Sequence, residues 1–540
     1  MRHPHARLDT ARLLVAFGAA LLASAPLAAH ATNVTEFPDN GSEQMARGGA
    51  WVARASDPLA TAFNPAGLAG QRTAFTIQAN LTLHDACFTR LKAANDTTDD
   101  SVAPGQHYPN VCAESKIFPN PQLGFNYRAT DRIGIGFAVL GPSGVGGHKW
   151  PEFVNTANGP AAAPNRYLLV EGKSTFLTPT LGAGFEVIDG LRLGAAFSWG
   201  IIKAKFNNAS PALNGNNLNP RGNDIDATLI VADYFVPQLR FGALYSPTEF
   251  FDVGLSYKWS DAVKARGDAY TRANYYTPAV ANGNKSGVVD GDTSVNDCNR
   301  GPAAAGVCGD GNNATLKLAV PMEARIGFRY HQPRGAAKPH SRDPIADDVF
   351  DAEVDFTWAN NSAFENLEIR FPGTAQGEGI IPANGTPGVI PPSADVPHFY
   401  KDVLGVRVGG DINVLPNQLA LRLGGYYETK AQDDRYQNTD FVGGSRVGLA
   451  AGGTYRLPVG ATGSVDLMLG FMHVFVSDQK NEDANGEGVS ALAGSPCNPT
   501  QPSGQPCEGG KTRYRTVWPI NLGTITNAFN VLNVGAAYKF

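Results

Sequence analysis

The feature that most constrains this chain is a two-residue alternation of apolar and polar side chains, repeated from Thr73 to the C-terminus. In residues 251–260, FDVGLSYKWS, the apolar side chains fall on one face and the polar side chains on the other. Residues 238–245 alternate in the same way, and the turn SPTE at 246–249 joins the two runs into a predicted hairpin. This period predicts β-strands with one apolar face rather than helices.

The number of such runs predicts the fold class. The tight gaps are ATDR, VIDG, SPTE and VLPN, residues 332–348 form an intermediate gap, and the other connections are much longer. Short turns at one end and long loops at the other are typical of outer-membrane barrels. We therefore expect an all-β fold, a 14-stranded antiparallel transmembrane β-barrel. Its strands are predicted near residues 73–84, 120–129, 132–141, 174–187, 191–205, 236–246, 250–266, 315–331, 349–359, 400–414, 418–429, 444–457, 462–477 and 528–540.

The N-terminus has the composition of an export signal. Basic residues precede the apolar run LLVAFGAALLASAPLAAHA, and the small residues Ala29 and Ala31 flank its end. We expect residues 1–31 to be a signal peptide that is cleaved before Thr32. The remaining chain has 41 basic and 48 acidic residues, a mild acidity that argues against nucleic acid as a partner.

Aromatic side chains near the predicted strand ends indicate two membrane interfaces. The C-terminal strand ends in Phe540 behind alternating apolar residues, which resembles the signal read by the barrel assembly machinery. We expect a monomer in the outer membrane of a Gram-negative bacterium. The predicted girdle residues are Tyr245, Tyr257, Trp259, Trp358, Tyr427 and Tyr538.

The stretch ATAFNPAGLAG, residues 60–70, breaks the pattern before the first strand. Pro65 between nearby glycines suits neither a helix nor a central strand. We expect residues 32–72 to form a compact irregular segment that the barrel, residues 73–540, shelters.

This arrangement resembles the outer-membrane long-chain fatty acid and hydrocarbon transporters of the FadL/TodX type (OMPP1). The matching stretch is ARGGAWVARASDPLATAFNPAGL, residues 46–68, and residues 190–206, 320–330 and 353–369 are also similar. The resemblance implies that residues 32–72 are a hatch, a plug inside the lumen, and that the barrel is not an enzyme and holds no cofactor. It implies passive uptake of long-chain fatty acids or other hydrophobic compounds. The hatch motif residues are Arg47, Gly48, Gly49, Asn64, Pro65, Ala66 and Gly67.

Counting by two places a set of charged side chains in the lumen. Acidic and basic residues occupy neighbouring strands, so they can pair with one another. Alternatively, one arginine is left to hold a ligand carboxylate bidentately. The candidates for ligand binding are Arg325, Arg329, Arg407 and Arg422.

Two lysines fall on the face of their strand opposite to the lumen. Lys203 and Lys205 are predicted to point outward at the rim, where outer-membrane lipids and lipopolysaccharide phosphates lie. Asn207 and Asn208 follow where the resembled family often has a basic residue, which leaves room for an uncharged hydrocarbon as ligand.

The third strand loses its alternation at Gly141-Pro142-Ser143-Gly144. Because leaving into water exposes a long apolar chain at roughly 0.8 kcal/mol per CH₂, sideways exit into the bilayer is favoured. A closed ladder forbids this exit. We expect Gly141, Pro142 and Gly144 to form a lateral gate, as a kink in the third strand does in the resembled family. The alternative is that Gly141 only begins an extracellular loop.

The six cysteines suggest disulfides in an oxidising compartment. We expect each successive pair to close within one long loop, because short loops lose least entropy. The expected pairs are Cys87–Cys112, Cys298–Cys308 and Cys497–Cys507.

Two other functions remain open from sequence alone. An outer-membrane hydrolase would join His84 and Asp85 to a loop serine, and a structural or adhesive barrel would use its long loops. No metal site is expected, since the acidic stretch 290–297 lacks the glycine and the closing glutamate of a calcium loop.

Overall fold

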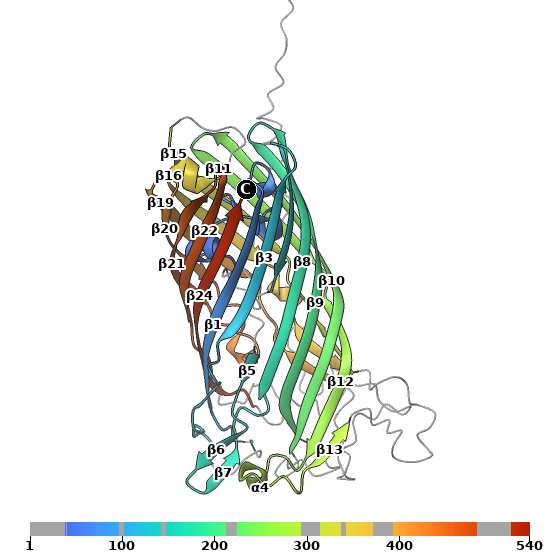
Figure 1. The fold of residues 1–540 in the computed structure, drawn as a ribbon. Coiled ribbons are helices and arrows are strands. Elements are labelled where there is room, and N and C mark those ends of the chain that lie inside the picture. Colours follow the sequence, from blue (N-terminus) through green and yellow to red (C-terminus); the bar gives the residue numbers. More distant parts are fainter. Residues whose placement is uncertain are drawn as a thin grey trace, which may run out of the picture.

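The computed structural model describes residues 38, 40–94, 96, 102–141, 147–211, 224–292, 314–335, 342–370, 393–482 and 520–540. These residues form a closed antiparallel barrel of 14 strands, in which the last strand pairs with the first (Figure 1). The predicted fold class is therefore confirmed. The membrane-crossing strands are β1 (Ala74–Arg90), β3 (Phe118–Arg128), β4 (Ile133–Leu140), β8 (Glu171–Ile188), β9 (Leu191–Pro211), β10 (Asp224–Thr248), β11 (Phe251–Ser260), β15 (Glu323–Pro333), β16 (Asp348–Ala359), β19 (Val403–Leu415), β20 (Leu419–Glu428), β21 (Arg446–Val459), β22 (Gly463–Val476) and β24 (Gly523–Lys539).

Several strands continue beyond a break near their extracellular ends. The breaks lie in neighbouring strands, so they form one line of interruption, here called the crease, across one wall of the barrel. The sequence did not predict it. Pro321 lies in one break and has no N–H for the ladder. The continuations are β12 (Val263–Ala273) after β11, β14 (Ala314–Leu318) before β15, β17 (Asn366–Arg370) after β16 and β18 (Ser393–Pro397) before β19.

Shorter elements decorate the extracellular end. β6 (Phe153–Thr156) and β7 (Gly159–Ala162) form a separate hairpin, and the others add to the main sheet or its loops. The additions are β2 (Val111–Cys112), β5 (Gly147–Lys149), β13 (Val289–Asp292), β23 (Gln479–Asn481), α4 (Pro278–Ala281), η2 (Asn361–Ala363) and η3 (Asp434–Tyr436). The intermediate link near 332–348 contains α5 (Pro344–Asp347) at the opposite, periplasmic end.

Burial alternates along the strands as the sequence predicts. Strand β4 reads exposed, buried, exposed, buried over most of its length, with Ile133, Ile135 and Phe137 outward. The outer face thus carries the apolar side chains that lipid requires. No helix in the described ranges has the length and hydropathy of a membrane-crossing helix.

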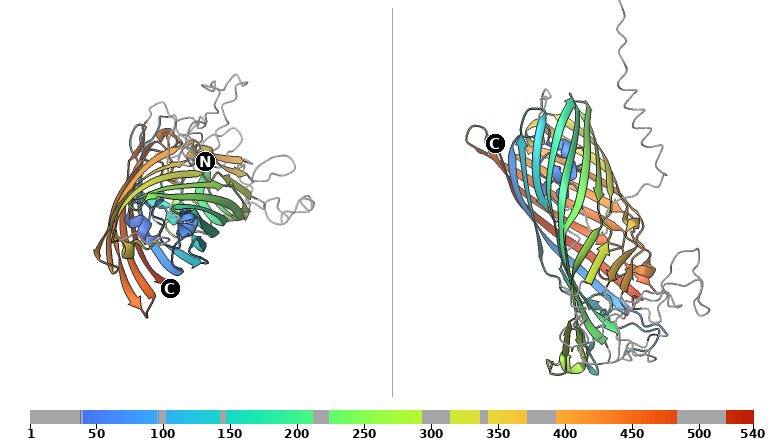
Figure 2. Two further views of the ribbon diagram at one scale, coloured as in Figure 1. Left: turned by 90° about the horizontal axis from the view of Figure 1, so that it is seen from above. Right: turned by 90° about the vertical axis from the view of Figure 1, so that its right-hand side faces the viewer.

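The segment before β1 lies inside the barrel. It contains α2 (Ser42–Ala46), α3 (Ala60–Phe63) and η1 (Pro65–Leu68), and the view along the barrel shows these blue elements enclosed by strands (Figure 2). Almost all of residues 40–71 are buried. The bounds and the role of residues 32–72 as one unit stay a prediction.

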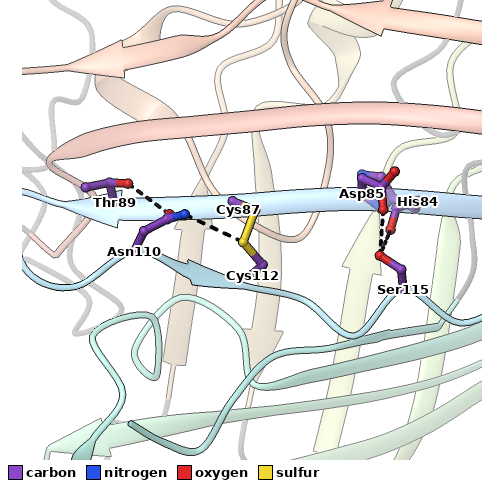
Figure 3. The surroundings of a disulfide bond; sticks show 7 residues. All are labelled: His84, Asp85, Cys87, Thr89, Asn110, Cys112 and Ser115. Carbon is purple, nitrogen blue, oxygen red and sulfur yellow. Dashed lines mark hydrogen bonds between the residues drawn. A yellow bond between two sulfur atoms is a disulfide. The ribbon is translucent and has the colours of Figure 1, made fainter. Parts of the chain in front are cut away.

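A disulfide joins Cys87 in β1 to Cys112 in β2 (Figure 3). Cys87 and Cys112 lie directly opposite each other in the ladder between these strands. The other expected pairs, Cys298–Cys308 and Cys497–Cys507, lie outside the described residues.

Candidate site in the barrel lumen

The N-terminal segment is anchored to one wall by buried ion pairs. Arg47 Nη1 lies 2.5 Å from both Asp351 Oδ1 and Asp411 Oδ1, and its Nη2 lies 3.1 Å from Glu353 Oε2. Arg54 contacts Asp351 and Asp411 as well. These arginines come from the segment and the carboxylates come from β16 and β19, so the pairs fix the segment in the lumen.

Two of the arginines predicted to bind ligand belong to this anchor. Arg422 Nε lies 2.7 Å from Asp411 Oδ2, and its Nη2 lies 3.0 Å from Glu43 Oε1. Arg329 contacts the carboxylates of Asp252, Asp348 and Asp351. Pairing of opposite charges therefore accounts for both side chains, and every guanidinium nitrogen of Arg329 and Arg422 has an acceptor in the protein.

The hatch motif residues shape the backbone of the segment. Asn64 Oδ1 accepts a hydrogen bond from Ala66 N at 3.3 Å, while its Nδ2 donates to Val52 O at 2.7 Å. Pro65 occupies the first turn of η1, where its missing N–H is not needed. Gly48 and Gly49 have φ of 62° and 85°, a region that side chains disfavour.

Lumen-facing glycines let the segment touch the wall directly. A Cβ on Gly134 would overlap the Leu68 carbonyl, and a Cβ on Gly194 would overlap the Pro65–Ala66 peptide. On the opposite wall, a Cβ on Gly424 would overlap the backbone of Arg47. The same close approach of backbone occurs at Gly184, Gly254 and Gly409, whereas a Cβ on Gly242 would overlap the Asn64 side chain. Backbone therefore packs on backbone around much of the barrel at this level.

Beyond the segment, the lumen is lined by apolar side chains. They form one buried cluster that joins β8 to β17, although β9, β10, β12 and β14 separate these strands in the sheet. Barrel interiors are ordinarily polar. The cluster consists of Phe176, Ile202, Ala204, Leu229, Val231, Val236, Val263, Ala265, Ala269, Ala314, Leu316, Leu318, Val320, Phe364, Leu367, Tyr400, Val403 and Ala431.

Between the apolar cluster and the segment lie two arginines with spare donors. Arg407 is fully buried, with Glu428 3.4 Å from its Nη2, and its Nε and Nη1 have no hydrogen-bond acceptor among the described residues. Arg325 bonds Glu323 at 2.8 Å, lies 5.8 Å from the centroid of the Phe63 ring, and leaves its Nε without a partner in the same ranges. Arg325 is also a charged neighbour of Arg407. Glu428, Asp355 and Glu323 already supply negative charge near Arg407, so what stays unsatisfied there is the pair of donors Nε and Nη1.

A small cavity lies between the N-terminal segment and the end of β4. Its volume is about 40 Å³, and its lining includes Asn40, Phe63, Gly141, Arg240 and Lys258. It thus touches the N-terminal segment, the basic side chains of Arg240 and Lys258, and the first of the predicted gate residues. Pro142 and Gly144 lie outside the described residues.

Among the described residues, the ladder between β3 and β4 ends beside this cavity. Pairing between β3 and β4 stops at Leu123↔Val139, whereas pairing between β3 and β1 continues through Asn120↔Asn80, near the middle of β1. Pro119 and Pro121 also pair with β1, and they have no N–H to give it. Hydrogen bonding alternates along an antiparallel strand, so the even-numbered residues of β3 donate to β1. The odd-numbered positions, which include both prolines, face the side where the pairing with β4 has ended. That edge exposes fewer unpaired N–H groups.

Side-chain amides connect this edge to the N-terminal segment. Asn120 Nδ2 donates to Gly141 O at 2.8 Å and to Asn40 Oδ1 at 3.2 Å. Gln122 Nε2 also donates to Asn40 Oδ1, at 3.1 Å, and its Oε1 accepts from Gly41 N. The start of the segment and the end of β4 are thus held by the same two side chains.

The residues of the hydrolase alternative do not form a catalytic arrangement. Ser115 Oγ donates to Asp85 Oδ1 at 2.6 Å, but Asp85 is exposed on the outer face (Figure 3). His84 instead turns its ring to His148 and Asn527. The described residues also contain no group of three or more His, Cys, Asp or Glu side chains placed to hold a metal ion.

Sequence reasoning missed three features of this site. The inward glycines could have been found, because they recur at lumen parity in strand after strand, as in GIGF and GAGF. The prolines of FPNPQL carried a signal of a ladder edge. The apolar cluster had weaker signals, because both faces of those segments carry apolar residues.

Comparisons with known proteins agree with this geometry. Residues 19–497 match the family model described as outer membrane protein transport protein (OMPP1/FadL/TodX). A Pseudomonas aeruginosa FadL homologue matches with a TM-score of 0.62 at 16% identity, over 95% of this chain and 100% of that one. The Pseudomonas putida toluene transporter TodX matches with a TM-score of 0.56 at 13% identity, over 94% and 99%. At these identities the likeness to solved structures shows the fold. No curated protein sequence matches the chain.

Proposed function

The chain belongs to the OMPP1/FadL/TodX family of outer-membrane transport proteins, and we propose that it takes up amphiphiles of the long-chain fatty acid class and releases them sideways into the bilayer. Proteins of this family are transporters of hydrophobic compounds in the Gram-negative outer membrane, not enzymes. The apolar cluster inside the extracellular half of the lumen carries the proposal. It offers an apolar compound a surface that a water-filled pore would not.

The lateral exit is supported by the close packing of the N-terminal segment. With Gly134 and Gly194 on one wall and Gly424 on the other, the segment leaves little room for an alkyl chain to pass along the barrel axis. We therefore assign residues 32–72 the role of a hatch. The cavity beside Gly141 and the interrupted ladder lie on the extracellular side of this packing, next to the bilayer.

Arg407 and Arg325 are proposed to bind the carboxylate end of the ligand. The spare Nε and Nη1 of Arg407 would gain an acceptor, and charge-assisted hydrogen bonds of this kind contribute about 1.5–3 kcal/mol. Arg329 and Arg422 are proposed to anchor the hatch instead, because their donors are already occupied by carboxylates.

Binding of oleate and of hexadecane to the purified protein tests the head group. Arg407→Gln should weaken oleate binding about 10-fold or more and leave hexadecane binding within 2-fold, since only oleate carries a carboxylate. Arg132→Gln, which breaks an exposed ion pair with Asp189, is the matched control. Equal weakening of both ligands would reject the carboxylate site, and uptake would then be of uncharged hydrocarbons.

A disulfide across the ladder end tests the exit. Asn120→Cys with Gly141→Cys should lock the edge, because a Cβ on Gly141 would lie 2.9 Å from Asn120 Oδ1. Oleate uptake should fall while oleate binding is retained. Tyr127→Cys with Ile135→Cys links the same two strands farther from the break and should leave uptake unchanged. Undiminished uptake in the locked protein rejects the lateral gate.

The remaining partners are also proposals. The exposed C-terminal aromatic Phe540 supports recognition by the barrel assembly machinery. Closure of the barrel within one chain supports a monomer in the membrane. Outward lysines near the rim support contact with lipopolysaccharide.

A further inference from the structure

A bulge in β10 places two consecutive aromatic side chains on the outer face. The register between β10 and β9 shifts between Asp233 and Val236, and Tyr234 and Phe235 are 61% and 53% exposed. In a regular strand one of two consecutive side chains would point inward. Bulges often re-aim side chains in this way.

Trp199 in β9 completes an aromatic platform with them. Its ring meets that of Phe235 edge to face at 5.2 Å, and its Nε1 donates to Tyr234 O at 2.5 Å. The indole is 50% exposed on the same face. Aromatic rings at this position are typical of the level where acyl chains meet head groups.

Basic side chains follow on the extracellular side of the platform. Lys203 is four residues beyond Trp199, roughly 13 Å along the strand, and its Nζ lies 5.6 Å from the centroid of the Tyr234 ring. Arg266 is next but one across the sheet, through Lys203↔Ala232 and Ala232↔Arg266, so their stems are about 10 Å apart. Lys173 lies diagonally from Lys203 on β8.

These three cations differ from the neighbouring lysines because none of them forms an ion pair with a carboxylate among the described residues. Lys205 pairs with Glu171 at 2.5 Å, Lys264 with Asp261 at 3.0 Å and Lys317 with Glu368 at 2.9 Å. In the part of the chain that the structure describes, no ion pair involves the side chains of Lys173, Lys203 or Arg266, all exposed. Of the nearby acids, Asp233 accepts two backbone N–H bonds, from Phe235 and Lys264, and Asp268 lies two residues beyond Arg266.

We propose that this surface, defined as Trp199, Tyr234 and Phe235 with Lys173, Lys203 and Arg266, binds the phosphorylated lipid A part of lipopolysaccharide. The strands that carry it, β8, β9, β10 and β12, lie side by side and run beyond the rest of the barrel (Figure 1). Acyl chains lie against the aromatic platform. The phosphates lie between the cations, where charge-assisted hydrogen bonds hold them. The surface is separate from the lumen and does not depend on the ligand carried there.

Native mass spectrometry of the purified full-length protein with lipid A tests this. A variant with Lys173→Gln, Lys203→Gln and Arg266→Gln should bind bisphosphorylated lipid A at least 10-fold more weakly than the unchanged protein. A control with Lys116→Gln, Lys430→Gln and Lys480→Gln removes the same charge elsewhere and should bind as before. Lipid A stripped of its phosphates should bind both proteins equally weakly.

Two further measurements separate the source of the phosphate. Inorganic phosphate at equal concentration should not displace lipid A, because it cannot use the aromatic platform, and Trp199→Ala should weaken lipid A several-fold. Phosphatidylglycerol should bind more weakly, with one phosphate for the three cations. Unchanged lipid A binding in the triple variant, or an equal loss for the lipid without phosphates, overturns the proposal.

Discussion

The lumen around the N-terminal segment and the lumen beyond it differ in what fills them. Around the segment, buried guanidinium groups such as Arg47 meet several carboxylates, and glycines bring backbone against backbone. Beyond it, Leu316, Phe364 and their neighbours form an apolar cluster. Buried ion pairs fix a segment in one position, because removing one partner leaves the opposite charges buried without compensation. An apolar cluster depends on side-chain volume rather than on direction, so it tolerates substitutions that keep its volume. The difference teaches that one barrel uses buried charge where it fixes its N-terminal segment and apolar packing beyond that level.

The largest expected effect is loss of the hatch anchor. Arg47→Ala leaves Asp351, Glu353 and Asp411 short of a partner inside the barrel, which should lower the free energy of unfolding by about 3–5 kcal/mol. Urea unfolding in bilayers measures this change in the free energy of unfolding. Arg132→Ala, in an exposed pair, should cost less than about 1 kcal/mol. Similar losses in both variants would mean that the buried pairs do not anchor the hatch.

Truncation in the apolar half should follow in size. Leu316 is 1% exposed, so Leu316→Ala should lower the free energy of unfolding by about 2–5 kcal/mol and weaken protection from hydrogen exchange in β12 and β14. Leu316→Met keeps most of the volume and should cost less than about 1.5 kcal/mol. Equal behaviour of the two variants would contradict tight packing of the cluster.

A side chain placed between hatch and wall should have a smaller effect on stability. Gly194→Val should cost about 1–3 kcal/mol, because its Cβ overlaps the Pro65–Ala66 peptide. Displacing the hatch should raise conductance in planar bilayers. Gly287→Val, where a Cβ meets no atom within 4 Å, is the control. Unchanged conductance in the Gly194 variant argues that residues 32–72 do not block the lumen.

The smallest expected effect is a pH dependence at the extracellular end. His148 lies in β5, 3.0 Å from His84 (Nδ1 to Nδ1), and burial lowers the pKa of His148 to about 4. The unfolded chain takes up this proton near pH 6.5, so the free energy of unfolding should fall as pH drops from about 6.5 to about 4. The slope should not exceed about 1.4 kcal/mol per pH unit. His148→Asn should remove this part of the dependence, and an unchanged profile would exclude His148 as its source.

The sequence by itself determined the strands, because alternation is written into each run and needs no distant partner. Fourteen runs, their outward faces and the tight turns follow from it. It also placed charges such as Arg422 and Asp411 on neighbouring strands. It could not say which arginine would keep unused hydrogen-bond donors, since that depends on the side chains that the N-terminal segment adds to the lumen.

The tertiary structure alone decided those partners. Arg47 and Arg54 enter the lumen from the N-terminal segment and take up carboxylates more than 290 positions away, whereas Arg407 is left with spare donors. The crease and the apolar cluster arise in the same way, because they depend on how several strands align and curl together. Local alternation reports which face a side chain takes. Which side chains meet across the lumen is set by the closure of the barrel around its own N-terminus.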